Sequence, residues 1–395
     1  MSGTLNNIYN NVSFALYLHS EAMARLQEQV STGSRINRVS DEPSTAYQIL
    51  GLNSQVSSLK NYTDNLSQVA SALEIASSVI EDMIPAFSEA KTILTQIVSG
   101  IYDEEGRERV AERINNTLEQ IVSLANSEHM NQYLFGGSNT ASEPYAVERT
   151  DGEITKVTYQ GSLEERNVEV APGVQLSAFY VGTTLFQSNN RSDPIFLGDT
   201  GAQPGTGTSS VTGDVWLTVT HNGSNYELSI DDGASTVVVP PGGEANQAVI
   251  NSETGQVLYV DSTGINSTGV DLVRVPGTYN IFDTLITIRD LLRNDRDLSD
   301  AQLEVLRNNS LNSLDDMNNL LVQNSVSVGS RIGFLETLKD SIKKIQYDAE
   351  DETTRLEEAD IAQIAIDLSR REVLYQMSLS IAGKLMSISL LDFIG

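Results

Sequence analysis

The sequence contains no cysteine among its 395 residues. Disulfide bonds, thiolate zinc sites and thiol nucleophiles are therefore excluded, because each of them needs a cysteine sulfur. Histidine is nearly as scarce, and its three copies, His19, His129 and His221, lie in separate segments without a partner at metal-ligand spacing. We interpret them as surface, interface or turn residues, and we expect no metal, no cofactor and no histidine-based catalytic centre.

Basic residues are also few: 25 lysines and arginines stand against 53 acidic residues, which gives a formal net charge of -28. Nucleic acids and anionic membranes attract proteins mainly through lysine and arginine, so we expect neither as a partner. Long apolar runs are missing too, and no stretch approaches the roughly 20 apolar residues that span a bilayer. No basic residue precedes Arg25, so the N-terminal segment does not resemble a Sec-type signal peptide. We expect a protein that is cytoplasmic or exported without a cleaved leader.

Motifs of catalysis and ligand binding are missing as well. The segment that begins at Asn294 has the spaced aspartates of a calcium loop, but Asp300 and Leu306 stand where such a loop needs glycine and glutamate. Neither a Gly-x-Ser-x-Gly nucleophile motif nor a phosphate-binding loop with Gly-Lys-Ser/Thr occurs. The sequence therefore predicts a protein that is not an enzyme.

Apolar residues repeat every seven positions in two long segments, which is the pattern of a helix with a narrow coiled-coil seam. The first repeat consists of Leu52, Leu59, Leu66, Leu73, Ile80 and Phe87, and the second of Leu314, Leu321, Val328, Leu335 and Ile342. Pro43 fits the first turn of the first helix, whereas Pro85 predicts a kink or a break near residues 81–85. The apolar spacing from Val110 to Leu124 predicts a further helix.

Two outer segments carry apolar stripes that predict a helix near each end of the chain. These stripes form the predicted assembly interface: Val12, Leu16, Met23, Leu26 and Val30 on the N-terminal helix, and Ile361, Ile364, Leu368, Leu379, Met386 and Leu390 on the C-terminal helix. A pair of lone helices has little core of its own and is stable mainly when it packs on other chains. We therefore expect these helices to pack on each other and on neighbouring subunits.

A short polar joint connects the first two predicted helices. We expect Gly33 to end one helix at a positive φ, and Ser40 or Asp41 to cap the next. Arg35 and Arg38 bring two positive charges to this joint, and we predict that they contact acidic surface on a neighbouring subunit. The alternative, two solvated arginines, stays open because an exposed ion pair contributes only about 0–1 kcal/mol.

The middle of the chain alternates apolar and polar residues, which predicts β-strands. Residues 213–240 have the pattern of a β-meander, with type I′ turns expected at Asn222-Gly223 and Asp232-Gly233. Further strands are expected at 154–159, 167–170 and 256–260. The predicted fold is mostly α with an inserted β region: an elongated rod of long antiparallel N- and C-terminal helices in coiled-coil packing, with a central β-rich part.

Four segments follow from these patterns. They are a terminal coiled-coil domain of residues 1–39 plus 358–395, a helical rod domain of 40–135 plus 280–357, a β-hairpin region at 136–186 and an inserted acidic β domain at 187–279. Arg191 is the one basic residue between Asn167 and Val273, which makes the insert strongly acidic. The lone tryptophan, Trp216, lies in the insert, and we interpret it as a partly exposed structural residue.

The stretch QVSTGSRINRVSDEPSTAYQI, residues 29–49, resembles the N-terminal motif of the bacterial flagellin family. The segments NQYLFGGSNTASEPY at 131–145, VTYQGSLEERNVEVAPGVQLSAFYVGTTLF at 157–186 and SLSIAGKLMSISLLDFIG at 378–395 are more similar to the hook-associated members of type 3 than to filament flagellins. The resemblance covers about residues 5–186 and 280–395. Pro85 and the pair Gly333-Phe334 depart from the family pattern.

The resemblance implies a structural adaptor at the junction of the flagellar hook and filament, exported unfolded by the flagellar type III apparatus and thus secreted. Its implied partners are further copies of itself in a ring or helical homo-oligomer, a neighbouring hook-associated protein, flagellin on the filament side, and a cytoplasmic export chaperone on the C-terminal helix. A filament-forming flagellin is one alternative. A surface enzyme or glycan-binding module on a coiled-coil stalk is another.

Overall fold

The structure is a computed structural model, and it describes the backbone of residues 2–99, 103–296 and 298–394. Side chains are described for residues 10–97, 103–177, 179–296 and 298–384. The chain divides into two compact units. Residues 1–64 with 338–395 form the terminal unit, and residues 65–337 form the central unit. Two long helices, α2 (Pro43–Ser99) and α6 (Asp300–Glu357), contribute to both units.

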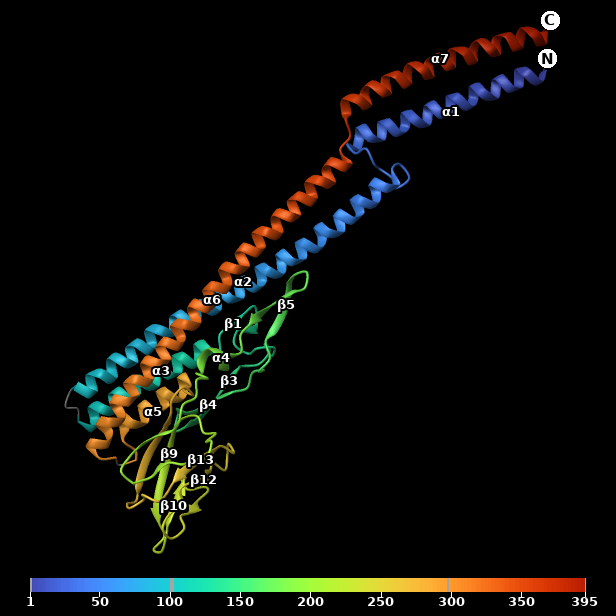
Figure 1. Ribbon diagram of the computed structural model, residues 1–395. Helices are drawn as coiled ribbons and strands as arrows, with labels where there is room; N and C mark the ends of the chain where they lie inside the picture. Colours follow the sequence, from blue (N-terminus) through green and yellow to red (C-terminus); the bar gives the residue numbers. More distant parts are fainter. Residues whose placement is uncertain (1, 100–102, 297, 395) are drawn as a thin grey trace. The chain divides into compact units, whose positions relative to one another are not determined.

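Within the terminal unit, α1 (Ser2–Thr32) and α7 (Ile361–Ile394) lie side by side and run antiparallel (Figure 1). They confirm the two predicted terminal helices. α1 ends where expected, because Gly33 has a φ of 71°, a left-handed conformation that glycine adopts without steric cost. α7 begins after Asp360, whose Oδ1 accepts a hydrogen bond from the backbone N of Gln363 at 3.0 Å.

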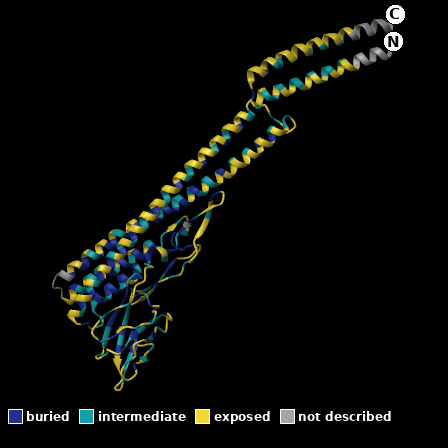
Figure 2. Ribbon diagram, viewed as in Figure 1, coloured by how far each residue is buried: buried dark blue, intermediate teal, exposed yellow. Residues whose placement is uncertain are grey.

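In the central unit, the two heptad repeats form the buried sides of α2 and α6 (Figure 2). The buried residues are Leu66, Leu73, Ile80 and Phe87 of α2 and Leu314, Leu321, Val328 and Leu335 of α6. Lys91 pairs with Asp315. Further back along α2, Glu81 accepts a hydrogen bond from the hydroxyl of Ser325 at 3.4 Å. A lower residue number on α2 therefore lies beside a higher residue number on α6, so the two helices are antiparallel, as predicted.

The prediction at Pro85 was a kink or a break, and the break is wrong, because α2 continues through this residue. Proline removes the hydrogen bond to the carbonyl four residues earlier, which belongs to Glu81. Both Pro85 and Glu81 lie on the exposed side of the helix. Water can therefore satisfy the freed carbonyl, and the helix continues because its buried side is unaffected.

Two shorter helices, α3 (Glu104–Ala125) and α5 (Ile281–Arg293), pack against each other, and α3 confirms the helix predicted from the spacing of Val110 to Leu124. α3 is capped by Asp103, whose carboxylate accepts a hydrogen bond from Gly106 N at 2.9 Å. α5 ends at Asn294, which takes a left-handed φ of 63°.

Small antiparallel hairpins follow α3. They are β1 (Glu128–His129) with β2 (Gln132–Tyr133), β3 (Tyr145–Thr150) with β4 (Glu153–Tyr159), and β5 (Arg166–Ala171) with β6 (Val174–Phe179), and the short helix α4 (Gly182–Phe186) follows them. β4 and β5 confirm two predicted strands, whereas β3 and β6 were not expected from the alternation. The rings of Tyr145 and Phe282, with centroids 4.7 Å apart, join β3 to α5.

The insert folds into two antiparallel sheets. Its strands are β7 (Ile195–Leu197), β8 (Gln203–Pro204), β9 (Gly213–His221), β10 (Tyr226–Ser229), β11 (Val237–Val238), β12 (Gln247–Ile250), β13 (Val257–Asp261) and β14 (Gly269–Val275). One sheet has the order β11-β10-β9-β14-β7 and the other β12-β13-β8. The predicted meander is confirmed as β9, β10 and β11. Leu217, Leu228, Leu258 and Val273 are fully buried in the shared core.

The turn between β9 and β10 differs from the prediction. Four residues, 222–225, connect the strands, and Asn222 N donates to Asn225 O at 3.1 Å. Gly223 has a φ of 92°, but Asn222 lacks the positive φ that a type I′ turn requires. The prediction of a two-residue turn is therefore wrong. The side chain of Asn222 accepts hydrogen bonds from backbone N–H groups of the loop and thereby stabilises a wider turn.

The insert leaves and re-enters the rest of the central unit at one point. Ser188 N donates to Tyr279 O at 2.8 Å. Nearby, Arg274 and Asp214 form a buried ion pair at 2.7 Å between β14 and β9. A second apolar cluster joins the sheet to α5 and α6: Leu272, Leu291, Leu298, Leu303 and Leu306.

Leu73→Ala is expected to destabilise the central unit by about 2–5 kcal/mol, because it removes a fully buried side chain and leaves a cavity. Val326→Ala, at a position of α6 in the same unit that is 67% exposed, is the control and should cost no more than about 0.5 kcal/mol. Urea unfolding followed by the fluorescence of Trp216 measures both. Equal losses in the two variants would contradict a core built on the heptad seam.

Candidate assembly surfaces

The apolar stripe predicted on α1 is only partly covered. Its half-buried members are Val12, Leu16, Met23 and Leu26. Val30 remains 40% exposed. At about 100° per residue, a second apolar group lies on the opposite side of the helix. This group, which the stripe did not predict, consists of Phe14, Tyr17 and Leu18, all exposed. α1 therefore has two apolar sides, and the pairing with α7 covers one of them.

α7 has the same two-sided character. Ile364 is buried and Leu368 half-buried, but Ile361 and Leu379 are 45% and 50% exposed. In a single chain, α1 therefore leaves Ile361 and Leu379 about half exposed, and their place in the assembly interface stays a prediction. Met386 lies in α7 beyond the side chains that the structure describes, and so does Leu390.

The opposite side of α7 carries a second apolar stripe. Its members are Ile366, Val373, Met377 and Ile381, and each is at least half exposed. Their spacing of seven, four and four residues is a helical repeat, so the sequence held the signal. Figure 2 shows α1 and α7 coloured mainly as exposed and intermediate.

The joint after α1 is fixed by two backbone hydrogen bonds, which we call the terminal clip. Arg35 N donates to Glu357 O at 2.7 Å, and Ala359 N donates to Gly33 O at 3.1 Å. The two segments form an antiparallel β-bridge at the place where α1 ends and α7 is about to begin. The clip therefore sets where the pairing of these two helices starts.

Arg35 and Arg38 both bond within the chain. Arg35 donates to Leu356 O at 3.2 Å and pairs with Glu42 at 3.2 Å, and Arg38 pairs with Glu28 at 3.2 Å. All of these arginine side chains are substantially exposed, and such pairs contribute about 0–1 kcal/mol each. Contact of the two arginines with a neighbouring subunit stays a prediction, and it would require these pairs to exchange partners.

Asp41 folds the joint instead of capping α2. Its Oδ2 accepts hydrogen bonds from Asn37 N at 3.2 Å and Arg38 N at 3.0 Å. Its Oδ1 pairs with Arg25 of α1 at 3.1 Å. The carboxylate therefore ties the joint back to the preceding helix, and α2 begins at Pro43.

A groove of about 600 Å³ lies between α1 and α7, and we call it the arginine groove. It is lined by Ala22, Arg25, Leu26 and Gln29 of α1 and by Asp367, Arg370, Arg371 and Leu374 of α7. Three arginines face one aspartate, so the groove is positive in a chain whose net charge is -28.

Comparison with known proteins points to the flagellum. Residues 4–140 match the family model of the bacterial flagellin N-terminal helical region. Flagellar hook-associated protein 3 of Escherichia coli strain K12 is 25% identical over 162 residues, which are 41% of this chain and 49% of that protein. The protein of the same name from Salmonella typhimurium is 26% identical over 165 residues, which are 42% and 50% of the two chains. The chain thus spans about half the length of the curated relatives it matches.

The fold agrees with the family match. The crystal structure of flagellar hook associated protein-3 from Legionella pneumophila has a TM-score of 0.53 at 17% identity, and the match covers 78% of this chain and 98% of that one. This likeness shows a shared fold. Over residues 4–140 the chain is flagellin-like. The predicted fold class, mostly helical with paired terminal helices and a central β region, is confirmed for this flagellin-like chain.

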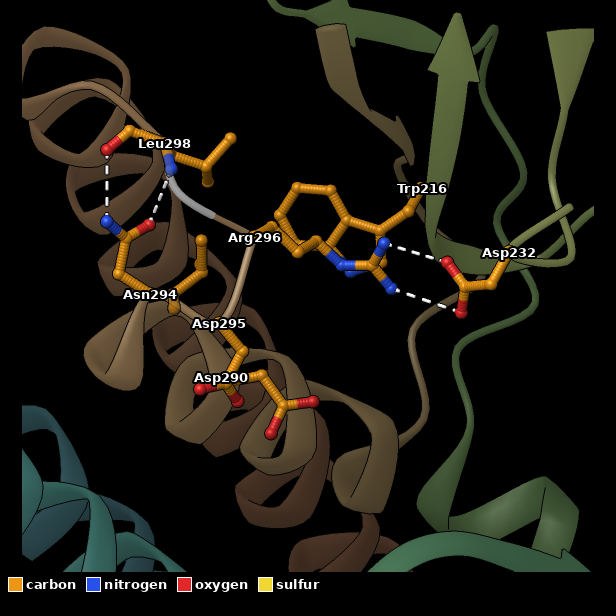
Figure 3. A pocket seen from close by; sticks show the side chains of 8 residues that line it. Trp216, Asp232, Asp290, Asn294, Asp295, Arg296 and Leu298 are labelled. Atoms are coloured by element: carbon orange, nitrogen blue, oxygen red, sulfur yellow. Dashed lines mark hydrogen bonds and ion pairs between the residues drawn. The ribbon is translucent and has the colours of Figure 1, made fainter. Parts of the chain in front are cut away.

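A hollow of about 300 Å³ in the flagellin-like chain lies between β9 and the loop after α5 (Figure 3). The guanidinium of Arg296 lies 4.8 Å from the centroid of the Trp216 ring and pairs with Asp232 at 2.8 Å. Asp290 and Asp295 line the opposite side. Since Arg296 covers a face of the indole, Trp216 offers no open stacking platform there for a sugar, which supports its interpretation as a structural residue.

Within the described ranges, no group of three or more histidine, aspartate or glutamate side chains is placed to hold a metal ion. In the same part of the chain, no helix is both long and apolar enough to cross a membrane.

Asp41→Ala is expected to speed amide hydrogen exchange at Asn37 and Arg38 at least ~10-fold, because a hydrogen bond to a charged group contributes about 1.5–3 kcal/mol. Ser40→Ala changes an exposed neighbour in the same joint and is the control. Hydrogen exchange with mass spectrometry measures both variants. Unchanged exchange in Asp41→Ala would show that this carboxylate does not hold the joint.

Proposed function

We propose that this flagellin-like chain is a structural adaptor of the bacterial flagellum, which joins the hook to the filament as a ring or helical homo-oligomer. The observation that carries the proposal is the two-sided apolar character of α1 and α7. Each helix packs on the other with one side and leaves an apolar group exposed on the opposite side. Helices that are apolar all round are normally buried all round, so neighbouring subunits are the natural cover.

The size of the exposed surface supports strong assembly. Fully burying a large apolar side chain contributes about 1.5–3 kcal/mol. Val373, Met377 and Ile381 on α7 are each at least half exposed in the single chain, and Phe14 and Tyr17 on α1 are more than 60% exposed. Each neighbour that covers one of these side chains adds to the free energy of association.

Charge supports a further copy of this chain as one neighbour. The chain is strongly acidic, so the surface of another copy presents many carboxylates. Arg370 and Arg371 in the arginine groove offer the opposite charge, whereas Arg25 already pairs with Asp41. Complementary charge of this kind orients an encounter more than it adds affinity.

The other parts of the proposal draw on the likeness to flagellar hook-associated protein 3. We place a hook-associated protein on the hook side, flagellin on the filament side, and the protein outside the cell at their junction. Export is unfolded, through the flagellar type III apparatus, and a chain without cysteine cannot form a disulfide on the way. A cytoplasmic chaperone covers the C-terminal helix before export, because its apolar sides would otherwise be exposed.

A filament-forming flagellin is the second candidate, because the matched family model describes flagellins in general. Electron microscopy of cells that lack the gene separates the two functions. Hooks without filaments, together with flagellin secreted into the medium, support the adaptor. Filaments that survive the loss of the gene support a minor flagellin instead.

Met377→Asp is expected to leave the single chain folded, because Met377 is 58% exposed, and to prevent filament growth in cells that lack the native gene. The substitution places an unpaired charge in a face that we propose to be buried. Gln376→Asp adds the same charge at the neighbouring exposed position and is the control. Electron microscopy scores the filaments. Normal filaments with Met377→Asp, or equal loss in both variants, would contradict the proposed interface.

α1 and α7 are expected to exchange amide hydrogens quickly in the free protein and slowly after assembly. Of the α7 side chains that the structure describes, Ile364 alone is buried, so the pair has little core before neighbours cover it. Hydrogen exchange on the free and the assembled protein tests this difference. Strong protection across residues 361–384 before assembly would show an independently stable helix pair and rule out folding coupled to assembly.

A further inference from the structure

The tip of the β9–β10 hairpin brings an asparagine, a glycine and a histidine together, away from α1 and α7 in the sequence. We propose that Asn222 is a self-modification site, at which the backbone nitrogen of Gly223 displaces the side-chain amide as ammonia with help from His221. The product is a cyclic imide, which water opens to aspartate or isoaspartate. This chemistry is independent of the proposed role in the flagellum.

His221 is placed to act as the base. The backbone N of Gly223 donates a hydrogen bond to Nδ1 of His221 at 3.0 Å. A neutral imidazole accepts at one nitrogen while its proton is on the other, so Nδ1 can take the proton of the attacking nitrogen. Tyr226, directly across from His221 in the strand pair, packs against the imidazole with ring centroids 5.1 Å apart. The contact holds the base beside the nucleophile.

The side-chain amide of Asn222 is held as an electrophile. Its Oδ1 accepts hydrogen bonds from Ser224 N at 3.1 Å and from Asn225 N at 3.0 Å. Two N–H groups aimed at one oxygen stabilise the negative charge that develops there when the carbon is attacked. Its Nδ2 donates to Glu227 at 2.6 Å, which fixes the orientation of the leaving nitrogen. Gly223 has no side chain to obstruct ring closure.

The chemical steps balance with water as the one co-reactant. His221 Nδ1 takes the proton from the nitrogen of Gly223, and this nitrogen forms a bond to Cγ of Asn222. Oδ1 carries the negative charge until the Cγ–Nδ2 bond breaks. The proton held by His221 passes to the departing nitrogen, which leaves as ammonia. Water then adds to one of the two imide carbonyls and opens the ring.

Asn251 offers a matched comparison in the same insert. Its Oδ1 also accepts two backbone hydrogen bonds, from Glu253 N at 3.0 Å and from Thr254 N at 2.9 Å. The polarised oxygen of Asn222 is therefore not unique in this chain. Any difference in reactivity must come from the residue that follows each asparagine and from the base.

Both of these factors are unfavourable at Asn251. The next residue is Ser252, whose side chain crowds the ring closure, and its backbone N donates to a carboxylate of Asp231 at 2.9 Å. Burial raises the pKa of Asp231, but hydrogen bonds from Ser252, Ser235 and Ser229 outweigh it and hold the pKa well below its usual value. A carboxylate stabilised in this way is a poor base, unlike the imidazole of His221.

The modification would change the hairpin locally. The amide of Asn222 donates to Glu227, and its conversion to a carboxylate replaces this hydrogen bond by a repulsion between two negative charges. Isoaspartate also adds a methylene to the backbone of the turn. The reaction therefore opens the tip of the insert and makes an acidic surface more acidic.

The test is to incubate the full-length protein in neutral buffer, once without urea and once with enough urea to unfold it. Peptide mass spectrometry then follows deamidation at each asparagine. In the folded protein, Asn222 is expected to deamidate faster than Asn251. Asn222 is also expected to deamidate at least ~10-fold faster in the folded than in the unfolded chain. This factor is smaller than the ~100-fold acceleration that a positioned base supplies. An equal or slower rate in the folded protein would overturn the proposal.

Two variants separate the base from the packing around it. His221→Gln is expected to slow the folded-state reaction at least ~10-fold, because glutamine cannot accept the proton as a base. Tyr226→Leu removes the ring contact but keeps the imidazole, and should slow the reaction far less. An unchanged rate in His221→Gln, or an equal loss in Tyr226→Leu, would show that His221 is not the base.

Discussion

The terminal clip is the contact on which the terminal unit depends. Its two hydrogen bonds connect Arg35 with Glu357 and Gly33 with Ala359, so they close a loop that contains the whole central unit. α1 ends and α7 begins beside this bond pair, which gives the two helices a common origin. Backbone groups supply both bonds, so many side chains are compatible with the clip. The positive φ of Gly33 is the local requirement that remains.

The two units bury their apolar residues in different ways. In the central unit, residues such as Leu66, Leu73 and Ile80 have no exposed surface, so this part has a core of its own. In the terminal unit, apolar side chains such as Met377 remain largely exposed. A net charge of -28 makes such chains repel one another in dilute solution, whereas the burial of apolar side chains favours their association once they are aligned. This balance fits the proposed assembly, in which the chains associate once they are aligned.

The sequence was informative where periodicity and burial coincide. The heptads of α2 and α6 predicted both helices and their buried sides, because one narrow seam meets one partner. The proline rule failed at Pro85, because the effect of a proline on a helix depends on whether tertiary packing leaves its position exposed. Periodicity also did not reveal how far α1 covers Ile361 and Leu379, since a helix with two apolar sides gives the same signal on both sides. The turn at Asn222-Gly223 was predicted in the right place but with the wrong type, because a side chain, and not the backbone pattern, determines its width.

The closure of the insert has a mechanical consequence. Ser188 and Tyr279 are joined by one backbone hydrogen bond, and the neighbouring Gln187 and Asn280 form a β-bridge. Tension applied between α4 and α5 therefore passes across this short connection and bypasses the sheets of the insert. The strands of the insert are therefore loaded along the backbone only after this connection breaks, whereas the packing of Leu272 on Leu291 and Leu303 couples the sheet directly to α5 and α6.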